Sequence, residues 1–206
     1  MDITLFIFQL IVLVFSVVVH EISHGFVAEQ LGDPTARRAG RLTLNPVNHI
    51  DPVGSVILPL LMAIAGGVVF GWAKPVPVNP RYFKNPERDY ALVSAAGPIS
   101  NLTLAAAFAI LFRALPFVVA GEAASALQNF FSIIVITNVS LAIFNLVPIP
   151  PLDGSGVLLA LLPRSAMGAR IFLERYGFII FLVFVFFGLS FIGPIIEFVA
   201  RTMLGM

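Results

Sequence analysis

Long apolar runs separated by short polar stretches dominate the pattern of this chain. Four of these runs hold the roughly 20 residues that a helix needs to cross the core of a bilayer. They extend from Ile3 to about Leu31, from Ala91 to about Leu115, from about Leu127 to Leu146, and from about Tyr176 to Val199. The pattern predicts an all-α polytopic membrane protein in which residues 1–206 form a single domain.

A fifth apolar stretch, Val53–Trp72, is also long enough to cross, but it contains Pro59 and the pair Gly66-Gly67. Helix-breaking residues at membrane depth are typical of segments that line a cavity inside a protein. Val53–Trp72 is therefore interpreted as a re-entrant segment, which enters and leaves the membrane on one side.

The placement of basic residues favours the same interpretation. A re-entrant Val53–Trp72 puts ten of the twelve Lys and Arg residues on one side of the membrane, whereas a crossing segment would split them five against seven. Basic residues concentrate in cytoplasmic loops. The basic side is therefore predicted to be cytoplasmic, and the N-terminus external.

A short β element is predicted between the first two core helices. Arg41–Leu44 alternates polar and apolar residues, which is typical of a strand, and Val76–Asn79 suits a second extended piece whose prolines confine it to an edge. An exposed strand edge can bind an unwound peptide by strand addition. A connecting loop at the membrane surface is the equally good alternative.

Composition excludes several classes of protein. The chain is 59% hydrophobic and only 11% charged, so a soluble domain of this length could not bury its apolar surface. The net charge of +1 and the absence of a basic stripe give no reason to expect a nucleic-acid partner. The absence of cysteine excludes disulfides, thiolate ligands and cysteine nucleophiles. Because no Lys or Arg precedes Arg37, the first run is expected to be a retained span and not a signal peptide.

The sequence His20-Glu21-Ile22-Ser23-His24 lies in the last turns of the first run, directly after the almost wholly apolar residues Ile3 to Val19. On a helix, His20 and His24 lie about 40° apart and one turn removed, so both imidazoles can reach one metal ion. Glu21 is then a candidate general base beside the metal. The alternative is a packing role, but a charge near the centre of a membrane helix costs roughly 2.5–3.5 kcal/mol, and such residues tend to mark function.

A catalytic zinc site usually has three protein ligands and a water, so a third ligand is needed. The candidates are Glu29, Asp33, His49, Asp51 and Asp153. Glu29 faces away from the histidines, and Asp33 lies in the turn signal Gly32-Asp33-Pro34. His49 and Asp51 lie in the polar connection and stay open as candidates. Asp153 is the strongest, because a proline-rich break after the third run can turn its carboxylate inward, although a turn aspartate fits that sequence equally well.

Three motifs in order resemble the site-2 protease family of intramembrane zinc metalloproteases. They are His20 to His24, the segment Ala96-Gly97-Pro98-Ile99-Ser100-Asn101, and the segment Asn145 to Gly154 with its Leu152-Asp153-Gly154 ending. The resemblance implies zinc bound by His20, His24 and Asp153, with Glu21 as catalytic base and Asn145 near the substrate. It gives Gly97 and Asn101 only a role in packing or bracing the core. The chain looks like a minimal form that lacks a recognition domain and starts at the first core helix.

The resulting expectation is a protease that hydrolyses peptide bonds of membrane-embedded or membrane-proximal protein substrates. Its location is predicted to be the lipid bilayer of the plasma membrane, with the active site toward the cytoplasm. With Val53–Trp72 re-entrant, Asp153 reaches the same side as the histidines, which agrees with the charge asymmetry. The alternative function is a membrane carrier or sensor of divalent metal ions that uses the same His20, His24 and Asp153 without hydrolysis.

Overall fold

The computed structural model describes residues 3–57, 61, 64, 73–119 and 121–206. Its long helices are α1 (Ile3–Gln30), α4 (Pro86–Ala114), α5 (Glu122–Asn145), α7 (Met167–Val183) and α8 (Leu189–Leu204). Two shorter α-helices are α2 (Thr35–Arg38) and α6 (Asp153–Leu161). The remaining helical turns are η1 (Pro46–His49), η2 (Pro52–Ile57), η3 (Pro80–Tyr82), η4 (Leu115–Phe117), η5 (Arg164–Ala166) and η6 (Phe184–Gly188).

Within the described residues, four helical segments are long and apolar enough to cross a membrane, and they correspond to the four spans predicted from the sequence. They are Ile3–Gln30, Pro86–Phe117, Glu122–Asn145 and Met167–Leu204. The last three begin earlier than predicted. The fourth starts at Met167 and not near Tyr176, because its first turns carry polar residues such as Arg170 and Glu174, which the search for apolar runs excluded.

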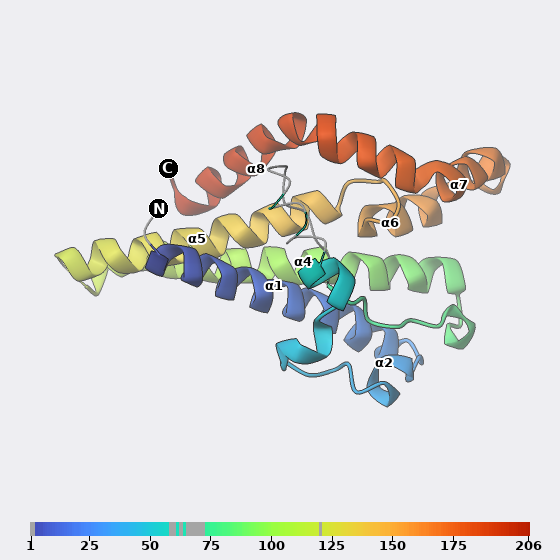
Figure 1. Ribbon diagram of the computed structural model, residues 1–206, viewed down its shortest axis with the longest axis horizontal. Coiled ribbons are helices and arrows are strands. Elements are labelled where there is room, and N and C mark those ends of the chain that lie inside the picture. The colour runs from blue at the N-terminus through green and yellow to red at the C-terminus, as the bar shows by residue number, and fades with distance from the viewer. Residues whose placement is uncertain (1–2, 58–60, 62–63, 65–72, 120) are drawn as a thin grey trace.

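Helix α4 lies at the centre of the fold and packs against both α1 and α5 (Figure 1). The C-terminal end of α1 and the N-terminal end of α4 lie at the same end of this bundle, where α6 also packs against α4 (Figure 1). Toward the opposite end, α8 packs against α5 and α4. A buried apolar cluster joins these three helices through Ala105, Ala109, Val135, Val139, Ala200 and Leu204. The small alanines allow the close helix approach that is typical of membrane bundles.

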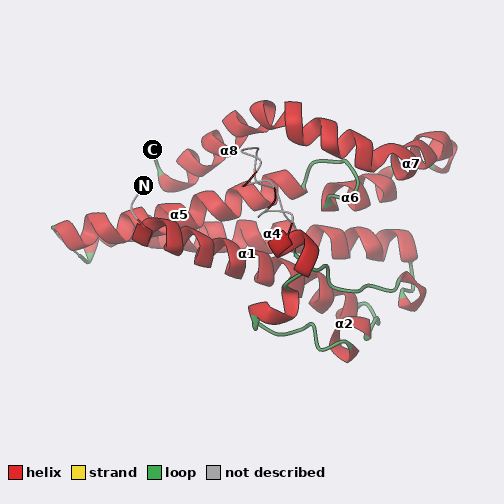
Figure 2. Ribbon diagram, in the orientation of Figure 1, coloured by secondary structure: helices red, strands yellow, loops and turns green. Residues whose placement is uncertain are grey.

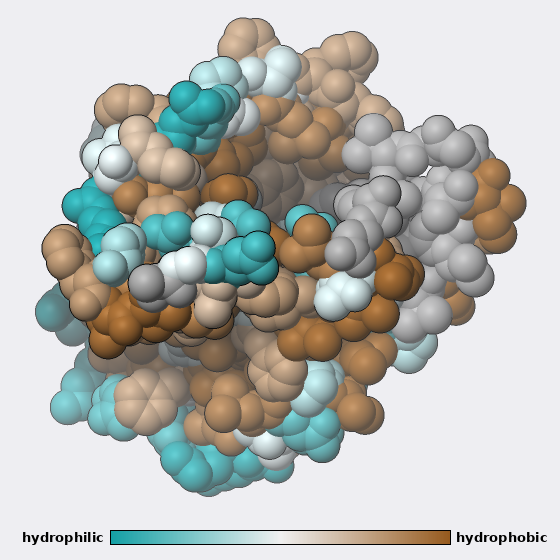
Figure 3. Space-filling view, turned by 90° about the vertical axis from the view of Figure 1, so that its left-hand side faces the viewer, coloured by the Kyte–Doolittle hydropathy of each residue, from teal (hydrophilic) through white to brown (hydrophobic). Residues whose placement is uncertain are grey.

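The outer surface of the bundle is strongly apolar. Large hydrophobic side chains such as Ile110, Phe178 and Phe191 are 68%, 64% and 77% exposed. Hydrophobic residues also cover much of the end at which both termini lie, and hydrophilic residues form smaller patches at its centre, at its upper left and along its lower edge (Figure 3). Apolar surface of this extent requires a lipid environment, so the chain is a multi-pass membrane protein.

The predicted β element is wrong, since the part of the chain that the structure describes contains no strand (Figure 2). Arg41–Leu44 forms bends, and Val76–Asn79 is irregular. The backbone N–H of Val76 donates to the Glu21 carboxylate, and that of Asn79 donates to Asp33. Pro77 has no N–H to give. Side-chain carboxylates therefore take the donors that a strand ladder would need, and the alternative of a connecting loop holds for these residues.

The proposed re-entrant segment, Val53–Trp72, lies largely outside the described residues, beyond η2 and the single residues 61 and 64. The chain on either side of it is described. The backbone N–H of Lys74 donates to the carbonyl oxygen of His49 at 2.9 Å. The residues that flank the segment therefore lie side by side.

Candidate metal centre

Helix α1 presents His20 and His24 on its face toward α4. Their ring centroids lie 4.7 Å apart, and the residues are only 6% and 9% exposed. Gly97 of α4 packs directly against both rings. A Cβ at this position would lie 2.5 Å from the Nε2 atom of each histidine. Only glycine lets α4 approach α1 this closely at the depth of the two imidazoles.

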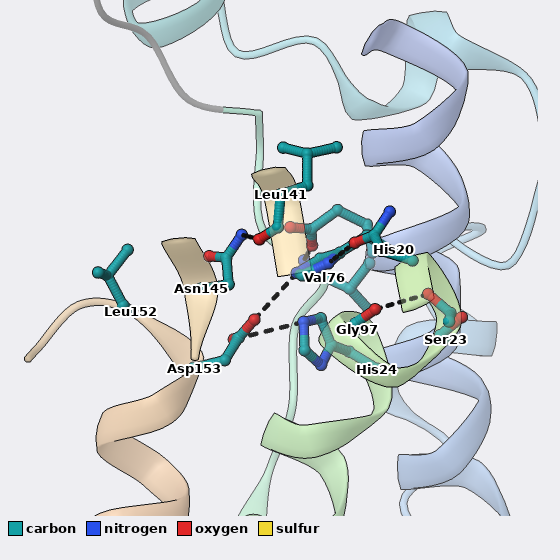
Figure 4. A network of polar contacts seen from close by, with 12 residues as sticks. His20, Ser23, His24, Val76, Gly97, Leu141, Asn145, Leu152 and Asp153 are labelled. Carbon is teal, nitrogen blue, oxygen red and sulfur yellow. Dashed lines mark hydrogen bonds and ion pairs between the residues drawn. The ribbon is translucent and has the colours of Figure 1, made fainter. Parts of the chain in front are cut away.

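Asp153 reaches the histidines from the other side as the first residue of α6 (Figure 4). Its Oδ2 lies 2.9 Å from His20 Nε2, and its Oδ1 lies 3.4 Å from His24 Nε2. The loop from Leu146 to Leu152 turns tightly between α5 and α6, and Gly154 sits against the backbone of Leu146 where a side chain would overlap. The proline-rich break thus turns the Asp153 carboxylate inward.

The other ring nitrogen of each histidine is held by a carbonyl oxygen. His20 Nδ1 lies 2.6 Å from the Oδ1 atom of Asn101, and His24 Nδ1 lies 2.7 Å from the backbone oxygen of Val93. A carbonyl oxygen only accepts hydrogen bonds, so each Nδ1 carries a proton and donates it. In the neutral imidazoles, both Nε2 atoms therefore direct lone pairs toward the Asp153 carboxylate.

This arrangement fits a bound divalent cation. Asp153 Oδ2 is buried and forms no hydrogen bond, although it faces His20 Nε2. Lone pairs that converge at these distances repel one another unless a positive charge lies between them. The ligand atoms of the three residues all lie within 4.8 Å of one another, and the set of two imidazoles and one carboxylate suits zinc.

Glu21 and Asn145 lie beside this cluster. Glu21 follows His20 on α1, and its Oε2 accepts a hydrogen bond of 2.8 Å from the backbone N–H of Val76. Asn145 is the last residue of α5, and its Nδ2 donates to the oxygen of Leu141 at 2.9 Å. Figure 4 shows the Asn145 amide next to the Asp153 carboxylate.

The other four candidate ligands are engaged elsewhere. Glu29 pairs with Arg37, and His49 Nε2 lies 2.9 Å from the backbone oxygen of Thr43. Asp51 accepts from the backbone N–H groups of Val53 and Gly54 at 3.0 and 2.7 Å. The Asp33 carboxylate accepts from the backbone N–H groups of Thr35 and Asn79 at 2.9 and 2.6 Å. Within the described residues, the group able to hold a metal consists of His20, His24 and Asp153.

Comparisons with known proteins agree with this geometry. Residues 116–191 match the sequence profile of Peptidase family M50. The chain is 43% identical over 179 residues to "Putative zinc metalloprotease YwhC" of Bacillus subtilis, an alignment that covers 85% of this chain and 78% of that protein. The chain belongs to peptidase family M50, the site-2 protease family.

More distant members of the family also match. "Putative zinc metalloprotease Rip2" of Mycolicibacterium smegmatis is 32% identical over 171 residues, which cover 82% of this chain and 62% of that protein. The protein of the same name in Mycobacterium tuberculosis is 35% identical over 148 residues, which cover 69% of this chain and 52% of its own length. No solved structure matches the chain.

Some residues of this M50 site could not be found from the motifs. The motifs gave Asn101 only a bracing role, yet its amide holds the ring of His20. Ser16 and Asn138 form hydrogen bonds behind it and were missed entirely. The signal available in the sequence was a polar residue within an apolar run, because buried polar groups in membrane helices require partners. The contact of His24 with the backbone oxygen of Val93 could not be found in this way, because every residue type has a backbone oxygen.

Proposed function

We propose that His20, His24 and Asp153 bind zinc and that Glu21 is the general base of an intramembrane endopeptidase. One observation carries the proposal: two buried imidazole Nε2 atoms and a half-buried carboxylate converge on one point between α1, α4 and α6. Zinc sites of catalytic type have three such ligands and leave a fourth position for water or substrate. When bound, zinc polarises the carbonyl of the scissile bond and makes a water acidic enough to attack near neutral pH.

The carboxylate of Glu21 moves the proton in this proposal. One of its oxygens takes a proton from the attacking water and passes it to the nitrogen of the leaving amine. The backbone N–H of Val76 holds the other oxygen, Oε2, so the orientation of the carboxylate is fixed before substrate arrives. A preorientated base needs no rearrangement at the moment of reaction.

Asn145 is proposed to contact the substrate. Its amide carries two N–H groups, and one of them is used by the oxygen of Leu141. The second can donate to the carbonyl of a bound peptide or to the oxyanion that develops during attack. The substrate class is proposed to be a membrane-embedded or membrane-proximal protein segment, which must unwind locally to expose its backbone.

The proposed orientation places the site toward the cytoplasmic face of the plasma membrane, with Val53–Trp72 entering and leaving on that side. Charge asymmetry supports it, as ten of twelve basic residues then lie on the cytoplasmic side. The hydrogen bond between His49 and Lys74 supports it as well, because the ends of a crossing segment would be separated by a bilayer core of about 30 Å. The alternative of a metal carrier is favoured by no comparison and by no contact in the described part of the chain.

The test is the pair Glu21→Gln and Glu197→Gln. Glu21→Gln removes the base while preserving shape, so cleavage of a single-span peptide in detergent should fall about 10²–10⁴-fold while zinc content stays at the wild-type level. Glu197 is exposed near the C-terminus and pairs with Arg201, so its replacement should leave both quantities unchanged. Full activity of Glu21→Gln would refute the assigned role.

A further inference from the structure

A continuous row of buried polar side chains joins three membrane helices behind His20. Ser16 and His20 lie one turn apart on α1, Asn101 lies on α4, and Asn138 lies on α5. The two asparagines are 0% exposed, Ser16 is 4% exposed and His20 is 6% exposed. Two fully buried amides in an otherwise apolar helix contact are costly unless their hydrogen bonds are satisfied.

Hydrogen bonds connect each side chain of this row to the next. Asn138 Nδ2 donates to the backbone oxygen of Ile134 at 2.9 Å and to Ser16 Oγ at 3.0 Å. Asn101 Nδ2 donates to Asn138 Oδ1 at 2.8 Å and lies 3.3 Å from the backbone oxygen of Ser16. Asn101 Oδ1 then faces His20 Nδ1 at 2.6 Å.

The direction of these hydrogen bonds is fixed at the end remote from the metal site. The backbone oxygen of Ile134 can only accept, so the NH₂ group of Asn138 must point toward it and its Oδ1 toward Asn101. Asn101 must then present its NH₂ group to Asn138 and its Oδ1 to His20. An oxygen facing His20 Nδ1 requires a proton on that nitrogen, which leaves Nε2 with its lone pair.

We propose that Asn138 is a positioning residue that acts through Asn101 to hold His20 in the tautomer able to bind the metal. The inference rests on the proposed function, since it takes His20 as a zinc ligand. His24 provides the contrast, because its Nδ1 faces the backbone oxygen of Val93, which cannot be turned around. The tautomer of His20 depends on two side-chain amides, whereas that of His24 is set by the backbone.

Loss of Asn138 should release this constraint. Asn101 would keep only the long contact of 3.3 Å with Ser16, so its amide could rotate and present the NH₂ group to His20 Nδ1. That nitrogen would then accept, and the ring proton would move to Nε2, where it blocks the metal. Mutation of the residues that hydrogen-bond to zinc-binding histidines commonly lowers metal affinity by 10–100-fold.

The experiment compares Asn138→Leu, Asn138→Asp and Asn129→Leu in the full-length protein in detergent. Leucine removes the hydrogen bonds at similar volume, whereas a neutral Asp carboxyl can still accept from Asn101 and donate to the oxygen of Ile134. Asn129 lies exposed on the same helix and serves as the control for adding an apolar side chain. Zinc affinity is measured by competition with a chelator. Asn138→Leu should bind zinc about 10–100-fold more weakly, with Asn138→Asp and Asn129→Leu close to the wild type.

Nitrogen-15 NMR of the metal-free protein reads the tautomers directly. The chain has three histidines, and the contact of His49 Nε2 with the oxygen of Thr43 makes that ring an internal reference of the opposite tautomer. Wild-type His20 and His24 should carry the proton on Nδ1 and His49 on Nε2. In Asn138→Leu, only the His20 signals should shift toward the Nε2-protonated form.

Two failures can be told apart. If His20→Ala retains wild-type zinc affinity, the assignment of His20 as a ligand is wrong and the proposed function fails with it. If His20→Ala loses zinc while Asn138→Leu keeps the wild-type affinity and tautomer, only the role of Asn138 is overturned. Should Asn138→Leu fail to fold, the wild-type spectrum still decides, because a proton on Nε2 of metal-free His20 contradicts the inference.

Discussion

The metal centre and the polar connection between α1 and α4 contain the same kinds of residue but use them in opposite ways. In the connection, residues 31–57 and 73–85, the carboxylates of Asp33 and Asp51 accept hydrogen bonds from nearby backbone N–H groups. At the metal centre, the carboxylate of Asp153 faces two imidazole nitrogens, and its buried Oδ2 has no hydrogen bond. The carboxylates of Asp33 and Asp51 are satisfied by N–H groups of the protein itself, whereas the arrangement at Asp153 fits a bound cation.

The histidines show the same difference. His49 in the connection is 3% exposed, as well buried as the two metal-site histidines, and its Nε2 is used by the backbone oxygen of Thr43. His20 and His24 direct the equivalent nitrogen toward Asp153. Burial therefore does not distinguish a ligand from a structural histidine. The rings differ in which nitrogen is left over and in what it faces: Nδ1 of His49 has no hydrogen-bond partner, whereas Nε2 of His20 and of His24 faces the Asp153 carboxylate.

The largest expected effect comes from replacing the aspartate of the candidate metal centre by asparagine, which exchanges one carboxylate oxygen for an NH₂ group. The same replacement in the connection is the control. Asp153→Asn removes the charge and half of the lone pairs offered to the metal, so zinc affinity should fall by more than the 10–100-fold typical of an outer partner, and cleavage should be lost. Asp51→Asn should leave zinc affinity unchanged, because its carboxylate only accepts from Val53 and Gly54. Equal losses of zinc in both variants, measured by chelator competition, would abolish the distinction between the regions.

Gly97→Ala should give the next largest effect. The new methyl group would lie 2.5 Å from the Nε2 atoms of both histidines, so α4 or the rings must move. Overpacking of this kind typically costs about 1–3 kcal/mol of stability, and here it also displaces two ligands. Gly168→Ala in α7 is the control, since nothing lies within 4 Å of its added Cβ. Wild-type zinc content and cleavage in Gly97→Ala would mean that the approach of α4 to α1 is looser than observed.

The structure brings together the three predicted metal ligands, whereas it contradicts the β element predicted in the connection. Helical spacing places His20 and His24 on one face of α1, and the four described spans correspond to four of the long apolar runs. Asp153 could not be separated from a turn aspartate by local sequence alone, because its role depends on how α6 meets α1. The resemblance to site-2 proteases supplied that step.

The β element was predicted wrongly for a related reason. Alternation over Arg41–Leu44 indicates only a local preference, and a strand needs a partner with free N–H and C=O groups. The N–H groups of Val76 and Asn79 donate instead to the carboxylates of Glu21 and Asp33, which are distant in the sequence. Similarly, the roles proposed for Asn101 and Asn138 depend on contacts between helices that no spacing within one helix reveals.

Within the connection, Asp33→Asn is expected to affect stability and not chemistry. Asp33 is fully buried and accepts from Thr35 at one oxygen and from the backbone N–H of Asn79 at the other. An amide puts an NH₂ group against one of these donors, which should lower the free energy of unfolding by about 1–3 kcal/mol. Denaturation in detergent measures the loss, and zinc affinity at a temperature where the variant is folded should equal that of the wild type. A selective loss of zinc would show that Asp33 belongs functionally to the metal centre.

The smallest effect is expected for Arg37→Ala, which breaks the ion pair between Arg37 and Glu29. The carboxylate of Glu29 holds the pKa of Arg37 above its ordinary value, yet the guanidinium side chain is 66% exposed, and water and salt screen such pairs strongly. The variant should unfold close to the wild-type midpoint, with any difference shrinking as the salt concentration rises. Cleavage and zinc affinity should not change, since the ion pair is remote from the metal-binding atoms of His20 and His24. A loss of cleavage with normal stability would instead indicate that this end of α1 contacts the substrate, and would move Arg37 from the structural region to the functional one.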